Sequence, residues 1–217
     1  ERSTIASRYN LNALKAQRDV TEKMMEGAGA MEDGALIRPY LAIFLHGKVD
    51  SMGADFEIAA CEKEGIEAID PAVAFWFADE LKIALETNGI KNNSGVIPTI
   101  NVVTSPGAYS GSRTLHRMRN GDKLFEFGGF GKMFQALQLE VGKYLRANYS
   151  TQLTEILNEL MEKFSTTFQT GEAIAAIDVN DRLVENKARE KERLAEKMKN
   201  VHYDGEVGED KVALSAA

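Results

Sequence analysis

The residues with the strongest chemical character in this 217-residue sequence gather between Tyr109 and Lys132. This basic-aromatic segment holds five Lys and Arg residues against Asp122 and Glu126, so its net charge is +3 in a chain of formal charge −7. Proteins that bind nucleic acids use such residues, because their cationic side chains pair with phosphates and their aromatic rings stack on unpaired bases. The candidate residues for binding nucleic acid or a protein partner are Tyr109, Arg113, His116, Arg117, Arg119, Lys123, Phe130 and Lys132.

The basic-aromatic segment also has a purely structural interpretation. Its aromatic side chains would then join the core of the protein, and its arginines would pair with the acidic surface. A polar, glycine-rich hairpin of this kind is also suited to be an arm between subunits. The sequence leaves these alternatives open.

The glycines Gly128, Gly129 and Gly131, followed by Lys132, raise the question of a phosphate-binding loop. Backbone N–H groups at a turn before a helix can bind an anion. The spacing does not match a Walker loop, which requires a glycine where Glu126 stands and Ser or Thr after the lysine. The glycines therefore favour a sharp turn with close backbone packing, and an enzyme with an anionic substrate remains a second alternative.

No other set of residues has the spacing of a catalytic or metal site. The single Cys61 has Glu62 and Glu64 beside it, which disfavours a nucleophilic thiolate. His46 and His116 have no placed nucleophile near them in the sequence. We therefore expect no catalytic residues, no metal ligands and no cofactor.

The composition limits the compartment and the partners. One cysteine excludes an intrachain disulfide, and no apolar stretch approaches the ~20 residues that cross a bilayer. The first residues lack the apolar core of a signal peptide. The sequence starts at Glu1 without Met, which we interpret as processing or trimming of a longer chain. We expect a protein of the cytoplasm or of a virion.

The elements that position these residues are predicted to be mostly helices. Apolar periodicity and Gly or Pro breaks predict helices over residues 5–26, 35–46, 54–63, 70–88, 132–148, 150–168 and 181–200. Asp70 followed by Pro71 is a typical helix start. Residues 72–78 after it are apolar on every face, so this helix is expected at the centre of the core.

Only a small amount of β-structure is predicted. Residues 96–104 are rich in β-branched side chains, which predicts a strand, and Pro98 indicates an edge position for it. Asn120 and Gly121 together favour a type I′ turn, which would pair Arg119 with Asp122 in a hairpin.

The predicted fold class is therefore mainly α. It is a multi-helix globular domain with a small inserted β-hairpin and a charged C-terminal helix. The predicted domains are a helical core at residues 1–149 with the hairpin insertion at about 96–128, a C-terminal helical pair or arm at 150–203, and a flexible acidic tail at 204–217.

The function expected from this sequence is structural. The lack of catalytic residues and the charged C-terminal helix favour a non-enzymatic assembly protein. We expect a helical subunit of a larger oligomer, for example a viral structural or nucleocapsid protein. The alternative is a nucleic-acid-binding module that uses the basic-aromatic segment. Oligomeric order, symmetry, ligand and source do not follow from the sequence.

Overall fold

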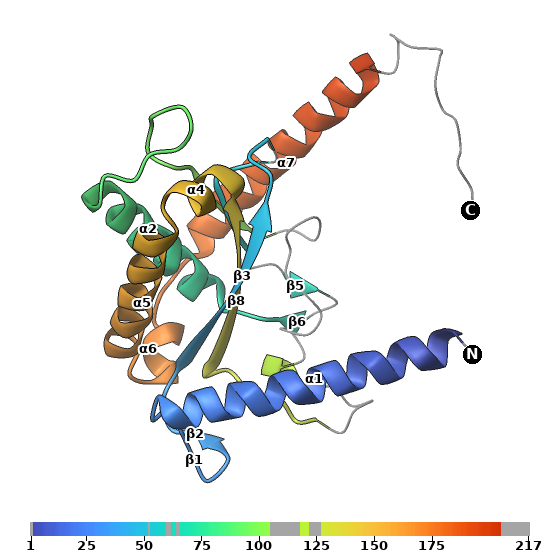
Figure 1. The fold of residues 1–217 in the computed structure, drawn as a ribbon, viewed down its shortest axis with the longest axis vertical. Helices are drawn as coiled ribbons and strands as arrows, with labels where there is room; N and C mark the ends of the chain where they lie inside the picture. The colour runs from blue at the N-terminus through green and yellow to red at the C-terminus, as the bar shows by residue number, and fades with distance from the viewer. Residues whose placement is uncertain are drawn as a thin grey trace. The chain divides into compact units, whose positions relative to one another are not determined.

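The computed structural model describes residues 2–51, 53–59, 62–63, 66–104, 118–121 and 127–204 (Figure 1). The chain divides into two compact units, Glu1–Val179 and Asn180–Ala217. The second unit consists, in its described residues, of one helix, α7 (Asn180–Asp204). The sheet and the surfaces described below belong to the first unit.

A four-stranded mixed sheet forms the centre of the first unit. Its strands are β3 (Tyr40–Lys48), β8 (Phe134–Gly142), β4 (Phe56–Ala59) and β7 (Ile100–Val103), in that order across the sheet. β3 runs parallel to β8, β4 antiparallel to β8, and β7 parallel to β4. All nine residues of β8 are buried, as expected for a central strand.

Two small antiparallel pairs accompany the sheet. β1 (Met31–Glu32) pairs with β2 (Ala35–Leu36), and β5 (Glu62–Lys63) pairs with β6 (Ile66–Glu67). The β1–β2 turn consists of Asp33 and Gly34, which both have positive φ, at 49° and 76°. This is the backbone requirement of a type I′ turn.

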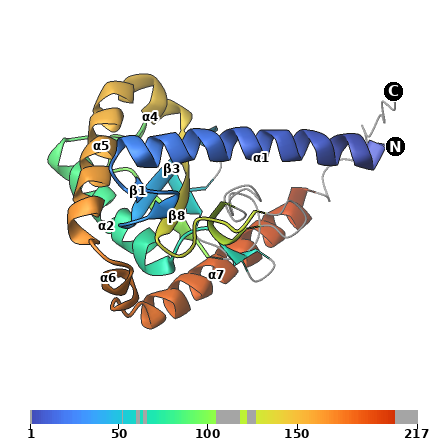
Figure 2. The same ribbon diagram turned by 90° about the horizontal axis from the view of Figure 1, so that it is seen from below.

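Helices lie on both sides of the sheet. Figure 1 shows α2 (Pro71–Thr87), α5 (Ser150–Thr167) and α6 (Gly171–Ala175) on one side of β3 and β8, with β5 and β6 on the other. The short helix α4 (Lys143–Asn148) directly follows β8. In Figure 2, α1 (Arg2–Gly27) runs from beside β1 and β3 away from the sheet toward the N-terminus.

The two faces of the sheet have different cores. On the face of α2 and α5, the apolar side chains include Phe56, Ile58, Leu139 and Val141, all of them buried. On the opposite face, one end holds a cluster of buried apolar residues from α1, β1, β8 and the segments that connect elements: Met25, Ala30, Met31, Ala68, Met118, Phe134 and Ala136. We call the first the helical face and the second the α1 face.

The prediction of a mainly α fold is wrong. Half of the residues are helical and one fifth lie in strands, and a mixed sheet organises the core. Three predicted helices are responsible. Residues 35–46 form β2 and most of β3, residues 54–63 contain β4, and residues 132–148 form β8 before α4 begins.

These three errors have a common cause, because the local pattern of each segment fits a helix as well as a strand. The run Tyr40–Leu45 of β3 is apolar almost throughout and β4 has only four residues, so neither carries a periodicity that separates the two. In β8, Leu137, Leu139 and Val141 alternate with Gln138 and Glu140, but Phe134, Leu137 and Val141 also have helical spacing.

Other predicted elements are confirmed. Helices occur at α1, α2, α5 and α7. α2 begins as expected, because the Asp70 side chain accepts a hydrogen bond from the Ala72 N–H at 2.9 Å and Pro71 occupies the first turn. The strand predicted over 96–104 is the shorter β7, and it lies at an edge of the sheet.

The predicted type I′ turn at Asn120–Gly121 is not formed. Residues 118–120 are helical, and among the described residues Asp33 is the non-glycine residue with positive φ. The other pairs of the predicted hairpin involve residues 105–117 and 122–126, which lie outside the described residues. None of the described helices is long and apolar enough to cross a membrane.

Candidate functional site: the outer edge of β3

The outer edge of strand β3 is the most unusual surface of the sheet. β3 pairs along nine residues with β8 and is the terminal strand in the sheet order, so within the described part of the chain its other edge has no strand beside it. Its first six residues, Tyr40–Leu45, carry no charge. An uncharged edge of this length is a template for adding another strand.

The hydrogen-bond pattern shows which residues face outward. The Tyr40 N–H donates to the Met133 carbonyl at 2.9 Å, so Tyr40 directs its backbone groups toward β8. Backbone groups of successive residues in a strand point to alternate edges. Ala42 and Phe44 therefore also bond toward β8, and the N–H and C=O groups of Leu41, Ile43 and Leu45 point outward.

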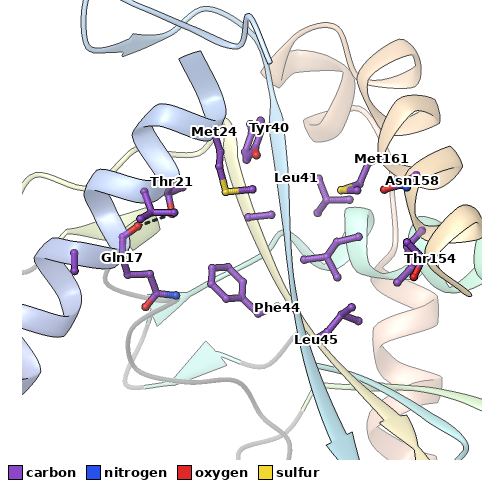
Figure 3. A pocket seen from close by; sticks show the side chains of 15 residues that line it. Gln17, Thr21, Met24, Tyr40, Leu41, Phe44, Leu45, Thr154, Asn158 and Met161 are labelled. Carbon is purple, nitrogen blue, oxygen red and sulfur yellow. Dashed lines mark hydrogen bonds between the residues drawn. The ribbon is translucent and has the colours of Figure 1, made fainter. Parts of the chain in front are cut away.

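An apolar groove of about 590 Å³ runs along this edge. Its floor is Tyr40–Leu45, and its walls are residues of α1 and α5 (Figure 3). The wall residues are Ala16, Gln17, Val20, Thr21 and Met24 of α1, and Thr154, Leu157, Asn158 and Met161 of α5. We call this surface the edge groove. Figure 3 shows Phe44 on the α1 side of β3 and Leu45 on the α5 side, so the groove passes around the strand edge.

Large apolar side chains are exposed around the edge groove. Val20, Met24 and Leu45 each keep 58% of their surface accessible to solvent, which places them among the most exposed large apolar residues in the described part of the chain. Contiguous exposed apolar surface next to polar surroundings is typical of an interaction site.

The opposite edge of the sheet provides a comparison. β7 has only four residues, and Pro98 lies two residues before it. Short strands and prolines are common protections of an exposed edge. A proline, Pro39, also precedes β3, but β3 has nine residues and its first six, Tyr40–Leu45, carry no charge, so this stretch is a longer uncharged edge than β7.

Three of the predicted binding residues lie in the described part of the chain. Arg119 is 5% exposed, Phe130 packs partly buried against the α1-face core, and Lys132 is exposed. Phe130 also lies in edge contact with Phe127 and tilted against Phe134. The other five, Tyr109, Arg113, His116, Arg117 and Lys123, lie outside the described residues.

The glycine-rich turn after Phe127 has a structural role. The N–H groups of Phe130 and Gly131 donate to the carbonyls of Met118 and Arg119, both at 2.8 Å. A side chain at Gly129 would place its Cβ 2.3 Å from the Gly121 nitrogen. The two backbones therefore touch, and these two N–H groups are bonded within the protein rather than directed at an anion.

A second group of functional side chains forms a polar row across the α1 face of the sheet. The register places His46 of β3 beside Glu140 of β8, Glu140 beside Glu57 of β4, and Glu57 beside Asn101 of β7. Glu57 and Glu140 are 1% and 5% exposed. Two buried carboxylates on neighbouring strands are a feature of both acid–base sites and structural networks.

The internal partners of the polar row favour a structural network. Glu57 accepts a hydrogen bond from the Ala54 N–H at 3.0 Å and another from the Asn101 amide. Glu140 accepts one from the Gln138 amide at 2.9 Å and lies 3.4 Å from His46 Nδ1.

Lys48 is the last residue of β3, and it lies near the carboxylates of the polar row. Burial lowers the pKa of Lys48, and the nearby carboxylates Glu57, Asp55, Asp50 and Glu140 oppose that shift. In the part of the chain that the structure describes, no group of three or more His, Cys, Asp and Glu side chains is arranged to hold a metal ion.

The sequence did not reveal either of these surfaces. The edge groove requires Tyr40–Leu45 to be a strand, and the polar row requires Glu57, Asn101 and Glu140 to lie on adjacent strands. The only local signal was the uncharged run at the start of β3, which also fits a buried helix.

Comparison of the sequence with models of known families and with curated proteins, and of the structure with solved structures, gives no match.

Proposed function

We propose that this protein is a non-enzymatic subunit of a larger assembly, and that the edge groove is the surface through which it assembles. The observation that supports this proposal is the uncharged strand edge Tyr40–Leu45, bordered by the exposed side chains of Val20 and Met24. An uncharged strand edge beside exposed apolar side chains favours contact with another polypeptide.

The polar row gives less support to an enzyme. Its two carboxylates already accept hydrogen bonds from Ala54, Asn101 and Gln138 within the sheet. A general base needs a lone pair directed at a substrate.

The test is size-exclusion chromatography with light scattering over a range of protein concentrations. The proposal predicts a defined multimer whose fraction increases with concentration. Absorbance at the nucleic-acid and protein maxima, recorded in the same run, detects copurified nucleic acid. A strict monomer at the highest concentration would refute the assembly role.

A further inference from the structure

We infer that two copies of this chain join by antiparallel pairing of their β3 strands around a two-fold axis at Ile43. The four-stranded sheet of one copy then continues into that of the other. This inference rests on the proposed assembly function and names its partner and its register.

The first argument is the outward hydrogen-bonding capacity of β3. Leu41, Ile43 and Leu45 each present one N–H and one C=O to the edge groove, as the Tyr40–Met133 bond requires. With the axis at Ile43, each Ile43 exchanges both bonds with Ile43 of the second copy. Leu41 exchanges both with Leu45 of the second copy, so every outward group in the groove is paired.

Neighbouring registers are less suitable. An axis at Ala42 would place Leu45 opposite Pro39 of the second copy, and proline has no N–H to donate. An axis at Phe44 would place Leu41 opposite Gly47, which does not line the edge groove and lies under the Arg146 guanidinium.

The second argument is the match of side chains in this register. On the helical face, Leu41 is opposite Leu45 and Ile43 is opposite itself, which makes a continuous apolar ladder. On the α1 face, the small Ala42 is opposite the large Phe44. Cross-strand pairs of this kind are the unit of sheet stabilisation, and no charged residue enters the ladder.

The third argument is the side chains beside the groove. On α1, Val20 and Met24 each keep 58% of their surface exposed beside the groove, as Leu45 does on β3. A two-fold interface uses the same surface patch of both copies, so these apolar side chains come from both partners. The self-complementary ladder and this apolar surface therefore favour a second copy over an unrelated peptide.

Two substitutions at the edge test the inference by light scattering. Leu45→Lys places a charge in the ladder, and Ile43→Pro removes an outward N–H without removing a bond to β8. The matched control is Ile83→Lys on α2, because Ile83 is 55% exposed and Leu45 is 58% exposed. We expect both edge variants to halve the mass of the dimer and the control to keep it, with circular dichroism confirming that all three fold.

A cysteine crosslink tests the register. In a Cys61→Ser background, Ile43→Cys places two cysteines opposite each other, with Cα atoms about 5.5 Å apart, which a disulfide can span. Ala42→Cys places them on a diagonal about 7–8 Å apart, which a disulfide spans poorly. We expect a covalent dimer on oxidation from the first variant only.

The outcomes separate this inference from the proposed function. A multimer that both edge variants leave intact, or a crosslink at Ala42 in place of Ile43, overturns the inference and leaves the assembly function standing. Dissociation by Ile83→Lys to the same extent as by Leu45→Lys also overturns it. A wild-type monomer overturns both.

Discussion

Tyr40 begins β3, and its environment has a measurable consequence. Its ring stacks on Phe134, with 6.3 Å between centroids, and burial raises the pKa of the Tyr40 phenol above 10.0. The fold therefore favours the protonated phenol over the phenolate.

We predict that Tyr40→Phe reduces the loss of stability at alkaline pH. A raised pKa contributes stability that is fully present below pH 10.0, the ordinary pKa of tyrosine, and that is lost as the pH rises through the folded value. Urea unfolding of both proteins at neutral pH and above pH 10 measures the difference. Equal pH slopes in the two proteins would contradict the prediction.

Asp70 provides a second prediction at the residue scale. Its carboxylate accepts from the Ala72 N–H at the start of α2, so Asp70→Ala should lower the free energy of unfolding by about 1 kcal/mol. Asp70→Asn retains an acceptor and is the control, with a much smaller loss. Denaturant unfolding of both variants measures the two losses in free energy of unfolding. Equal losses would show that the helix cap of Asp70 does not account for the effect.

Glu57 and Glu140 show why the polar row could not be predicted from the sequence. Both look like solvated charges on predicted helices, but in the sheet they are buried neighbours with backbone and amide partners. Their pairing depends on strand contacts between residues far apart in the chain, which no local pattern contains.

At the scale of elements, the accuracy of the sequence prediction follows the local signals. α2 was predictable because Asp70 and Pro71 mark its start chemically. α5 was predictable because its apolar stripe Leu153, Ile156, Leu157 and Leu160 has helical spacing and is buried as expected.

β3 and β8 were not predictable by the same means. The run Tyr40–Leu45 of β3 has no alternation, and in β8 the alternation of residues 137–141 competes with the helical spacing of Phe134, Leu137 and Val141. Without β3, the edge groove has no floor, so the candidate site could not be found before the fold was known.

The glycine-rich turn gives a prediction at this scale. Gly129 has φ of 74° and no room for a Cβ, whereas a Cβ at Gly128 meets nothing within 4 Å. Gly129→Ala should cost about 1–2 kcal/mol for the backbone conformation alone, with the steric contact adding to it. Gly128→Ala is the matched control. Thermal melts compare the two, and a stable Gly129→Ala would refute the close contact.

At the scale of the whole molecule, the formal charge of −7 affects association. Copies of equal charge repel each other, and salt screens that repulsion. An interface formed by uncharged strand edges gains from this screening.

We therefore predict that added salt strengthens self-association or leaves it unchanged. Binding to nucleic acid has the opposite dependence, because salt competes with the released counterions. Light scattering across a salt series distinguishes the two functions. A multimer that dissociates steeply as salt increases would favour the nucleic-acid alternative over the edge groove.

The strand order also determines when the sheet can form during synthesis. β8 lies between β3 and β4, and both precede it in the chain by a long stretch of sequence. Until Gly142 has left the ribosome, the apolar residues of β3 and β4 have no central strand on which to pair. Between the synthesis of Leu45 and that of Gly142, the uncharged run Tyr40–Leu45 has no partner strand of the sheet beside it. We therefore expect chaperones that bind extended apolar segments to recognise this run in the nascent protein.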